Sequence, residues 1–309
     1  MIAGIDIGGT KIAIGLIDDR GTVKVRNEIP VEVECGPTNA RDRIQKIVQS
    51  QLRKTHAELK GIGIGCTGPL DPIRGELGEV HTLPGWKGWN PVQELSESFG
   101  VTAAMENDAD AAALGEARWG KGVGRRSLIS ITVGTGIGAG IVLDGKLYRG
   151  AQHSHPELGH QILSPEGPLC TCGALGCWES LASGPALERW YAELNPHAIR
   201  RSGSDICALA RFGDLPAQRA VDQLVKYLGL GIGNVVSMFI PEVIALSGSV
   251  MQSADLLLGP IRTIVHSNCR LVPPDGYEIA ISSLGTEAGL IGAAQVWHSH
   301  FSEGLQDNL

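Results

Sequence analysis

The sequence IAGIDIGGTKIAIGLI, residues 2–17, decides the fold that we expect for this chain. Its first six residues are apolar except for Asp6, and this pattern predicts a short buried strand. Glycines and a threonine interrupt the apolar run at 8–10, and the apolar residues 12–17 predict a second strand that returns beside the first. The opening of the chain is therefore a strand, a polar glycine turn and a strand.

A similar unit recurs in the sequence ISITVGTGIGAGIVL, residues 129–143. Residues 129–133 predict a strand, 134–140 a glycine turn and 141–143 a return strand. The two units begin about 127 residues apart, and a repeated supersecondary unit indicates two related domains. Two unrelated hairpins would give the same pattern, and the sequence alone leaves that alternative open.

The rest of the chain alternates between helical and strand patterns, which is typical of an α/β protein. Apolar spacing, Pro and Gly positions and buried runs set the expected elements. We expect helices at 38–59, 109–119, 184–194, 216–239, 255–267 and 287–299, strands at 61–66, 243–247 and 277–282, and a frayed tail at 303–309.

Length and composition narrow the class of protein. The 309 residues suit two domains, and the net charge of −7 argues against nucleic acid as a partner. No basic leader precedes the first strand, and the apolar run 228–250 is broken by Asn234, Pro241 and Glu242. Seven cysteines with three clustered indicate a reducing compartment rather than a disulfide framework. We expect a cytoplasmic protein without a membrane span.

The cluster of cysteines forms a motif of its own. His160, Cys170, Cys172 and Cys177 have the spacing H-x9-C-x-C-x4-C, and three thiolates with one imidazole are the ligand set of a structural zinc site. Prolines and glycines between them suit a tight knuckle. Three buried cysteines and a core histidine are the alternative. Two acids, Glu157 and Glu179, flank this zinc knuckle, which would hold them rigidly at a polar ligand.

The two glycine turns, at 8–10 and 134–136, are candidate phosphate sites. Backbone N–H groups without a Cβ can approach phosphate oxygens, and Asp6 stands where it could order a magnesium ion. The chain contains no G-x-x-x-x-G-K-[ST] motif. Residues 63–68 match G-x-G-x-x-G, but prolines follow where a helix would have to start, so we treat the match as accidental and keep only Gly68 as a candidate pocket residue.

Asn107 and Asp108 follow a short apolar run and precede an alanine-rich helix. A carboxylate at such a strand-to-helix junction points into a cleft in many open sheets. Asn and Asp are also common helix caps, and spacing alone favours neither role. Asp110 stands close by, in the expected first turn of the helix.

With these residues in hand, the chain resembles the ROK family of sugar kinases, within the actin and hexokinase superfamily. The resemblance covers nearly the whole chain. It implies an α/β fold with duplicated actin-like ATPase (ribonuclease H-like) domains around a central cleft: a small domain at 1–118, joined by a C-terminal helix at 290–309, and a large domain at 119–289 with the knuckle. The motifs that carry it are Asp6–Lys11, Glu106–Asp108, Gly134–Gly136, Glu157–His160, the knuckle through Glu179, and Ser183-Gly184.

The resemblance also implies roles for single residues. Asp108 would be the catalytic base, and Asp6 would act near the magnesium ion of MgATP. Structural zinc would be held by His160 and the three knuckle cysteines. The expected sugar-binding residues are Gly68, Thr82, Asn107, Asp108, Glu157, His160 and Glu179. The expected nucleotide-binding residues are Asp6, Gly8, Gly9, Thr10, Lys11, Gly134, Thr135, Gly136 and Gly248, the last in a turn that departs from the family's consecutive glycines.

The activity implied is ATP-dependent phosphorylation of the 6-hydroxyl of a hexose, with glucose favoured. Thr82, ahead of Leu-Pro-Gly-Trp, resembles N-acetylmannosamine kinases, and the run 154–157 resembles fructokinases; N-acetylglucosamine is a further alternative. Trp86 and Trp89 are either sugar-stacking or core residues. A sugar-binding protein without activity, or a sugar-responsive regulator, is the alternative class, although Asp6 leaves no room for a preceding DNA-binding segment. A homodimer is expected, and polyphosphate is an alternative donor.

Overall fold

The computed structural model describes residues 1–197 and 199–301, and within them the chain forms two compact units. Unit 1 comprises 1–126, 140–156 and the described residues from 283 onward, and unit 2 comprises 127–139 and 157–282. The predicted tail at 303–309 and the last residues of the predicted helix 290–309 lie outside the described residues. The predicted domain boundary at 118/119 stays a prediction.

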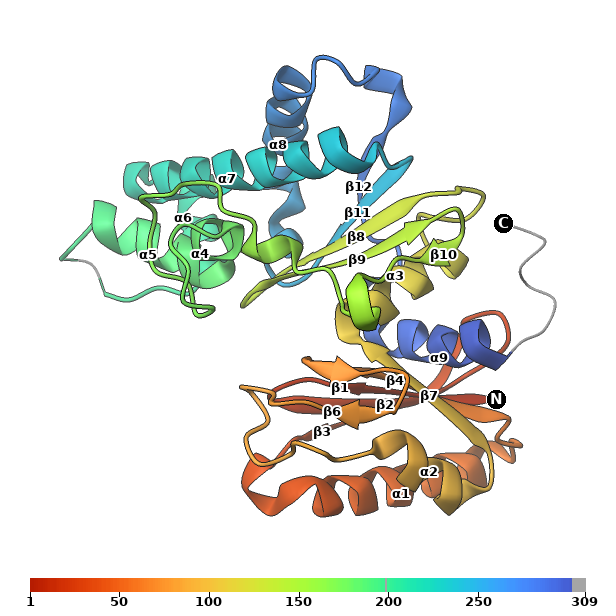
Figure 1. Cartoon of the computed structure of the whole chain (residues 1–309). Helices are drawn as coiled ribbons and strands as arrows, with labels where there is room; N and C mark the ends of the chain where they lie inside the picture. The colour runs from red at the N-terminus through yellow and green to blue at the C-terminus, as the bar shows by residue number, and fades with distance from the viewer. Residues whose placement is uncertain (198, 302–309) are drawn as a thin grey trace. The chain divides into compact units, whose positions relative to one another are not determined.

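Each repeated unit of the sequence becomes the first hairpin of a five-stranded mixed sheet, as Figure 1 shows. The sheet orders are β3-β2-β1-β4-β7 and β10-β9-β8-β11-β12, so both follow the same pattern of third, second, first, fourth and fifth strand. β1 and β2 are antiparallel, and the third strand of each sheet is antiparallel to the second. The fourth and fifth strands of each sheet are parallel to the first. This matching order agrees with the duplication that the sequence predicted. The strands are β1 (Ile2–Ile7), β2 (Lys11–Ile17), β3 (Val23–Pro30), β4 (Gly61–Cys66), β7 (Thr102–Asn107), β8 (Leu128–Val133), β9 (Ile137–Leu143), β10 (Lys146–Leu147), β11 (Val243–Ser247) and β12 (Glu278–Ile281), with a separate pair β5 (Leu70–Asp71) and β6 (Glu76–Leu77).

The helices cover the sheets of their own units. In unit 1, α1 and α2 lie on one face of the sheet and α9 on the other (Figure 1), while in unit 2 α7 packs against α4, α5, α6 and α8. Because both faces are covered, β1 and β4 are apolar and buried throughout their length, apart from half-buried Asp6. The helices are α1 (Gly36–Thr55), α2 (Pro91–Phe99), α3 (Asp108–Trp119), α4 (Trp178–Ala182), α5 (Gly184–Leu194), α6 (Gly203–Arg211), α7 (Leu215–Phe239), α8 (Ala254–Asn268) and α9 (Ala288–Phe301).

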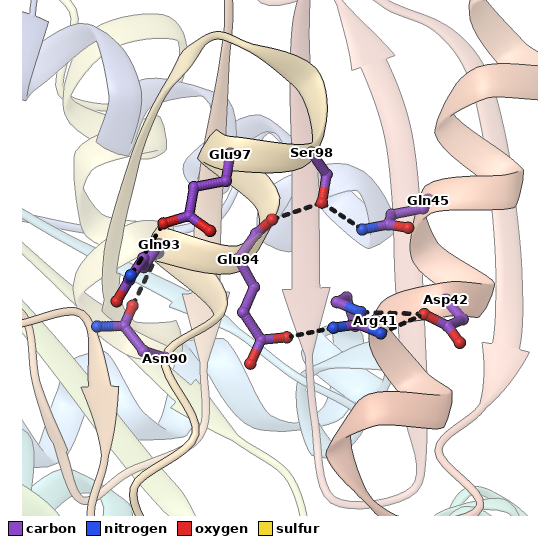
Figure 2. A network of polar contacts seen from close by, with 8 residues as sticks. All are labelled: Arg41, Asp42, Gln45, Asn90, Gln93, Glu94, Glu97 and Ser98. Atoms are coloured by element: carbon purple, nitrogen blue, oxygen red, sulfur yellow. Dashed lines mark hydrogen bonds and ion pairs between the residues drawn. The ribbon is translucent and has the colours of Figure 1, made fainter.

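A polar network joins α1 to α2 on the outer side of unit 1 (Figure 2). Arg41 donates to Asp42 of its own helix and, over 3.3 Å, to Glu94 of α2. Gln45 donates to Ser98, which in turn donates to the backbone oxygen of Glu94. Such half-exposed pairs contribute little to stability individually, so the network mainly fixes the alignment of the two helices.

Close packing of α9 determines where the polar groups of unit 1 lie. A Cβ atom added at Gly63 of β4 would collide with the backbone oxygen of Ala293, and one at Gly292 would collide with the backbone oxygen of Ala111 in α3. Only glycine therefore permits these helix and strand backbones to approach so closely. The same approach brings the first turn of α9, at Gly289, against the carboxylate of Asp6.

Two sequence predictions about this architecture need correction or a decision. The helix predicted at 38–59 ends at Thr55, because His56 adopts a left-handed conformation with φ of 50° and stops it. Trp86 and Trp89 are core residues: both are buried, and their rings meet edge to face with centroids 5.2 Å apart. Among the described residues, no helix is long and apolar enough to cross a membrane.

Candidate active site

Asp108 is the first residue of α3 and directly follows the end of β7. The side chain of Asn107 caps the helix by accepting the N–H of Ala109 over 2.9 Å, and one oxygen of Asp108 accepts the same N–H over 2.8 Å. Asn107 is thus the helix cap, and the role of Asp108 stays a prediction. Burial raises the pKa of Asp108, which the Ala109 N–H and His155 partly counteract.

Asp6 is the second carboxylate of this region. Gly65 lies beside both acids: a Cβ built there would be 3.8 Å from Oδ1 of Asp6 and 3.7 Å from Cα of Asp108. Burial, and next the charge of Asp108, raise the pKa of Asp6 to about 6. A carboxylate whose charged form is disfavoured by burial and by the charge of a neighbouring carboxylate suits a divalent cation, which prefers oxygen ligands. The residues therefore fit a magnesium ion at Asp6.

The raised pKa of Asp6 predicts that the folded protein becomes less stable when this carboxyl group loses its proton. Because the folded pKa is about 6 and the ordinary value 3.8, folding loses stability as the pH rises through that window, by up to about 3 kcal/mol. We expect Asp6→Asn to raise the melting temperature most at pH 8, by roughly half as much at pH 5, where the unfolded carboxyl is already charged, and hardly at all at pH 3. Thermal melts without nucleotide or added magnesium measure this, and a larger gain at pH 5 than at pH 8 would contradict it.

The first glycine turn lies beside Asp6. The N–H of Gly8 donates to the oxygen of Lys11 over 3.0 Å and closes the turn between β1 and β2. Thr82 lies against Gly9, since a Cβ built at Gly9 would be 2.7 Å from the Cβ of Thr82. Thr82, the residue predicted to select the sugar, therefore packs against the predicted phosphate turn.

Gly68 belongs to the same unit. A Cβ built at Gly68 would lie 3.2 Å from the amide nitrogen of Asn107. Unit 1 thus gathers most of its predicted site residues around the carboxyl ends of β1, β4 and β7, the usual place for ligands in such sheets.

Unit 2 holds the second glycine turn, between β8 and β9. The N–H of Gly134 donates to the oxygen of Gly136 over 2.9 Å, and the oxygen of Gly134 accepts the N–H of Gly184 at the start of α5 over 2.8 Å. The turn at Gly248 packs on it, because a Cβ built at Gly134 would be 3.5 Å from Oγ of Ser249. Both predicted nucleotide turns of this unit are therefore adjacent.

Glu179 contacts this turn directly. One carboxylate oxygen, Oε2, accepts the N–H of Ile137 over 2.9 Å. A Cβ at Gly136 would collide with the same oxygen, so the glycine leaves room for the carboxylate in this position. The predicted sugar-binding acid thus has one oxygen engaged by the backbone that follows the phosphate turn.

The predicted zinc ligands gather as the motif requires. One ligand atom from each of His160, Cys170, Cys172 and Cys177 lies within 4.8 Å of all the others. Sγ of Cys170 is 3.6 Å from Nδ1 of His160, and the Sγ atoms of Cys172 and Cys177 are also 3.6 Å apart. Tetrahedral zinc with Zn–S bonds of about 2.3 Å separates two sulfurs by roughly 3.8 Å, so these residues fit zinc.

Local backbone structure produces this arrangement. Antiparallel bridges pair Ile162 with Cys177 and Leu169 with Leu175, and the N–H of Gly173 closes a turn on the oxygen of Cys170 over 3.0 Å. Glu157 is exposed at the entrance of the knuckle, where its Oε2 lies 3.9 Å from Nε2 of His160. The imidazole therefore presents Nδ1 to the thiolates and Nε2 towards Glu157.

Sequence reasoning missed three ionic pairs close to Asp108. Asp110, set aside as a first-turn residue, is buried and lies 2.9 Å from Nδ1 of His155. Glu106 is buried as well, and Arg149 and His300 bind its carboxylate. These partners are distant in sequence, and the only available signal was that acids in a buried strand and helix require partners.

The strand order, the glycine turns and the acid at the β7–α3 junction define an α/β protein with mixed sheets, consistent with the actin-like ATPase fold. A structure of this kind is the ROK family glucokinase from Streptomyces griseus in complex with glucose and AMPPNP, which is 31% identical, has a TM-score of 0.80 and is covered over 98% of its chain and 96% of this one. The ROK family model matches residues 2–300. The chain belongs to the ROK family.

Its relatives within the family include enzymes and regulators. A glucokinase from Streptomyces coelicolor is 35% identical over 95% of this chain and 96% of its own. A xylose repressor from Bacillus subtilis is 30% identical over 96% of this chain and 77% of its own. The kinase relatives therefore match the chain along nearly their whole length, and the repressor extends further.

Proposed function

We propose that this chain is an ATP-dependent sugar kinase that phosphorylates the 6-hydroxyl of a hexose, with glucose the favoured substrate. Membership of the ROK family and similarity to glucokinases support the reaction class. The observation that carries the proposal is Asp108, a half-buried carboxylate anchored through Ala109 at a strand-to-helix junction, beside the half-buried Asp6. That pair supplies a base and a cation site in one place.

In this proposal Asp108 accepts the proton of the sugar hydroxyl as its oxygen attacks the γ-phosphorus of ATP. Phosphoryl transfer depends mainly on positioning and charge neutralisation, so one well-placed base is enough. Asn107 and Gly68 line the sugar beside Asp108, and the turn at Gly9 donates backbone N–H groups to phosphate. Magnesium, when bound near Asp6, neutralises charge on the phosphates.

Unit 2 contributes the other set of groups. The turn at 134–136 binds phosphate and the adjacent turn at Gly248 lies near the adenosine. Glu157, His160 and Glu179 bind sugar hydroxyls, and the knuckle fixes their positions. Zinc, when bound by four protein ligands, has no open position and is structural.

A substrate panel tests the proposal. Release of ADP from MgATP is measured with glucose, mannose, fructose, glucosamine, N-acetylglucosamine and N-acetylmannosamine, and polyphosphate replaces ATP in a parallel series. We expect kcat/KM to be highest with glucose and ATP. A higher kcat/KM with N-acetylmannosamine would make that sugar the substrate instead of glucose. In that case we expect Thr82→Asn to shift the preference towards glucose. No turnover with any sugar would overturn the kinase assignment.

The similarity to the xylose repressor supports one alternative function, that of a sugar-binding regulator without catalytic activity. Isothermal titration of glucose without nucleotide separates the two functions, because a regulator would bind sugar and show no ADP release.

We also propose that the protein is a homodimer. Multi-angle light scattering of the zinc-loaded protein measures its oligomeric state.

A further inference from the structure

The backbone of Ile137 is contacted on two sides, at its N–H and at its carbonyl, by residues adjacent to the predicted zinc ligands. Glu179 accepts its N–H over 2.9 Å, and a Cβ added at Gly159 would collide with its carbonyl oxygen. Glu179 stands two residues after Cys177, and Gly159 directly precedes His160. Both ends of the knuckle therefore contact the residue that follows the phosphate turn 134–136.

Glu179 is fixed in place by the packing of its neighbour in the sequence, Trp178. Trp178 is fully buried, and its ring packs so closely on Gly231 of α7 that a Cβ there would collide with it. Glu179 belongs to α4, a helix of five residues that begins right after the ligand Cys177. The carboxylate position is thus determined by the knuckle on one side and by α7 on the other.

We propose that Glu179 is a positioning residue for the phosphate turn, and that the metal knuckle shapes the nucleotide site through it. This inference rests on the proposed function, in which the turn 134–136 binds phosphate. It assigns the knuckle a second task besides holding the sugar-binding acids. A charged acceptor orients the Ile137 N–H, and with it the path of the Gly134–Gly136 backbone, before any ligand arrives.

The size of the effect follows from the kind of bond. A hydrogen bond to a charged group, once lost, costs about tenfold or more in whichever equilibrium depends on it. If Glu179 served only the sugar, its replacement would change sugar affinity and leave nucleotide affinity intact. The two roles are therefore separable by measuring nucleotide binding in the absence of sugar.

Titration of the zinc-loaded protein with Mg-AMPPNP, without sugar, is the test. We expect Glu179→Ala and Glu179→Asp to weaken binding about tenfold, since the shorter Asp keeps the charge but loses the reach to Ile137. Glu179→Gln retains an acceptor oxygen and should stay within about threefold of the natural protein. Glu157→Ala is the matched control, because Glu157 is a predicted sugar ligand of the same knuckle that does not contact the turn.

Hydrogen exchange of the Ile137 amide gives a second readout that needs no nucleotide. We expect faster exchange in Glu179→Ala, Glu179→Asp and the metal-free protein, and natural rates in Glu179→Gln and Glu157→Ala. Unchanged AMPPNP affinity in both Ala and Asp variants would overturn the positioning role alone. Failure of the natural protein to bind AMPPNP would overturn the proposed function with it, while the exchange rates would still report whether the contact forms in solution.

Discussion

We expect Asp108→Ala to lower kcat by about 10²–10⁴-fold, the usual contribution of a general base. The sugar hydroxyl must lose its proton as it attacks phosphorus, and without the carboxylate only water can accept it. The KM for MgATP should change little, because Asp108 is proposed to act on the sugar hydroxyl and the phosphate turns keep all their residues. Steady-state kinetics with the best sugar of the panel measure both constants.

Asp110→Asn is the matched control for this experiment. Asp110 is a buried acid two residues further along α3, so its replacement removes one negative charge from the same helix turn. It lies against His155 and is not proposed to contact sugar, and we expect kcat to fall by less than about tenfold. Similar losses in both variants, or full activity in Asp108→Ala, would remove Asp108 from the role of base.

The second large effect is expected from removal of the metal. Four ligand atoms lie within 4.8 Å of one another, and on removal of the metal the thiolates take up protons and the knuckle loses the bonds that close it, so it should open. Loss of several kcal/mol in unit 2 would lower its melting temperature by on the order of 10 °C. Sugar affinity should fall as well, because His160 and Glu157 would no longer be held.

Two exposed cysteines provide a matched pair for this prediction. Cys172 belongs to the knuckle and Cys35 lies outside it, and both are exposed free thiols. We expect Cys172→Ser to lose bound zinc, measured by elemental analysis, and to melt earlier by calorimetry. Cys35→Ser should retain zinc and the natural melting temperature. A Cys172→Ser protein without metal but with unchanged melting would show that the knuckle does not depend on the ion.

Prediction from sequence succeeded where the signal was local. The strands Ile2–Ile7, Gly61–Cys66 and Val243–Ser247 and the helix Gly184–Leu194 have the predicted bounds, because buried apolar runs end at glycine, proline or polar residues. The glycine turn predicted at 134–140 is shorter, since β9 resumes at Ile137. Glycines at 138 and 140, which are typical of turns, concealed a strand that is buried for most of its length.

What was missed depends on contacts between distant residues. Helices α2 and α6 are short and amphipathic, and most of their stabilisation comes from packing on other elements rather than from local pattern. In the candidate site, the clustering of the four knuckle residues was predictable from their spacing alone. The hydrogen bond from the Ile137 N–H to Glu179 was not predictable. The two partners are 42 residues apart, and the sequence offered each of them other partners that were equally plausible.

The packing of α9 on β1 has a consequence for synthesis of the chain. Strand β1 leaves the ribosome well before α9, which packs on one of its faces, so unit 1 stays open until α9 has been made. At about 5–20 residues per second, that interval is roughly 15–60 s. Unit 2 lies between these two ends and can be complete earlier. Nascent chains of this protein should therefore carry an exposed apolar sheet face for most of their synthesis, which makes them natural clients for chaperones at the ribosome.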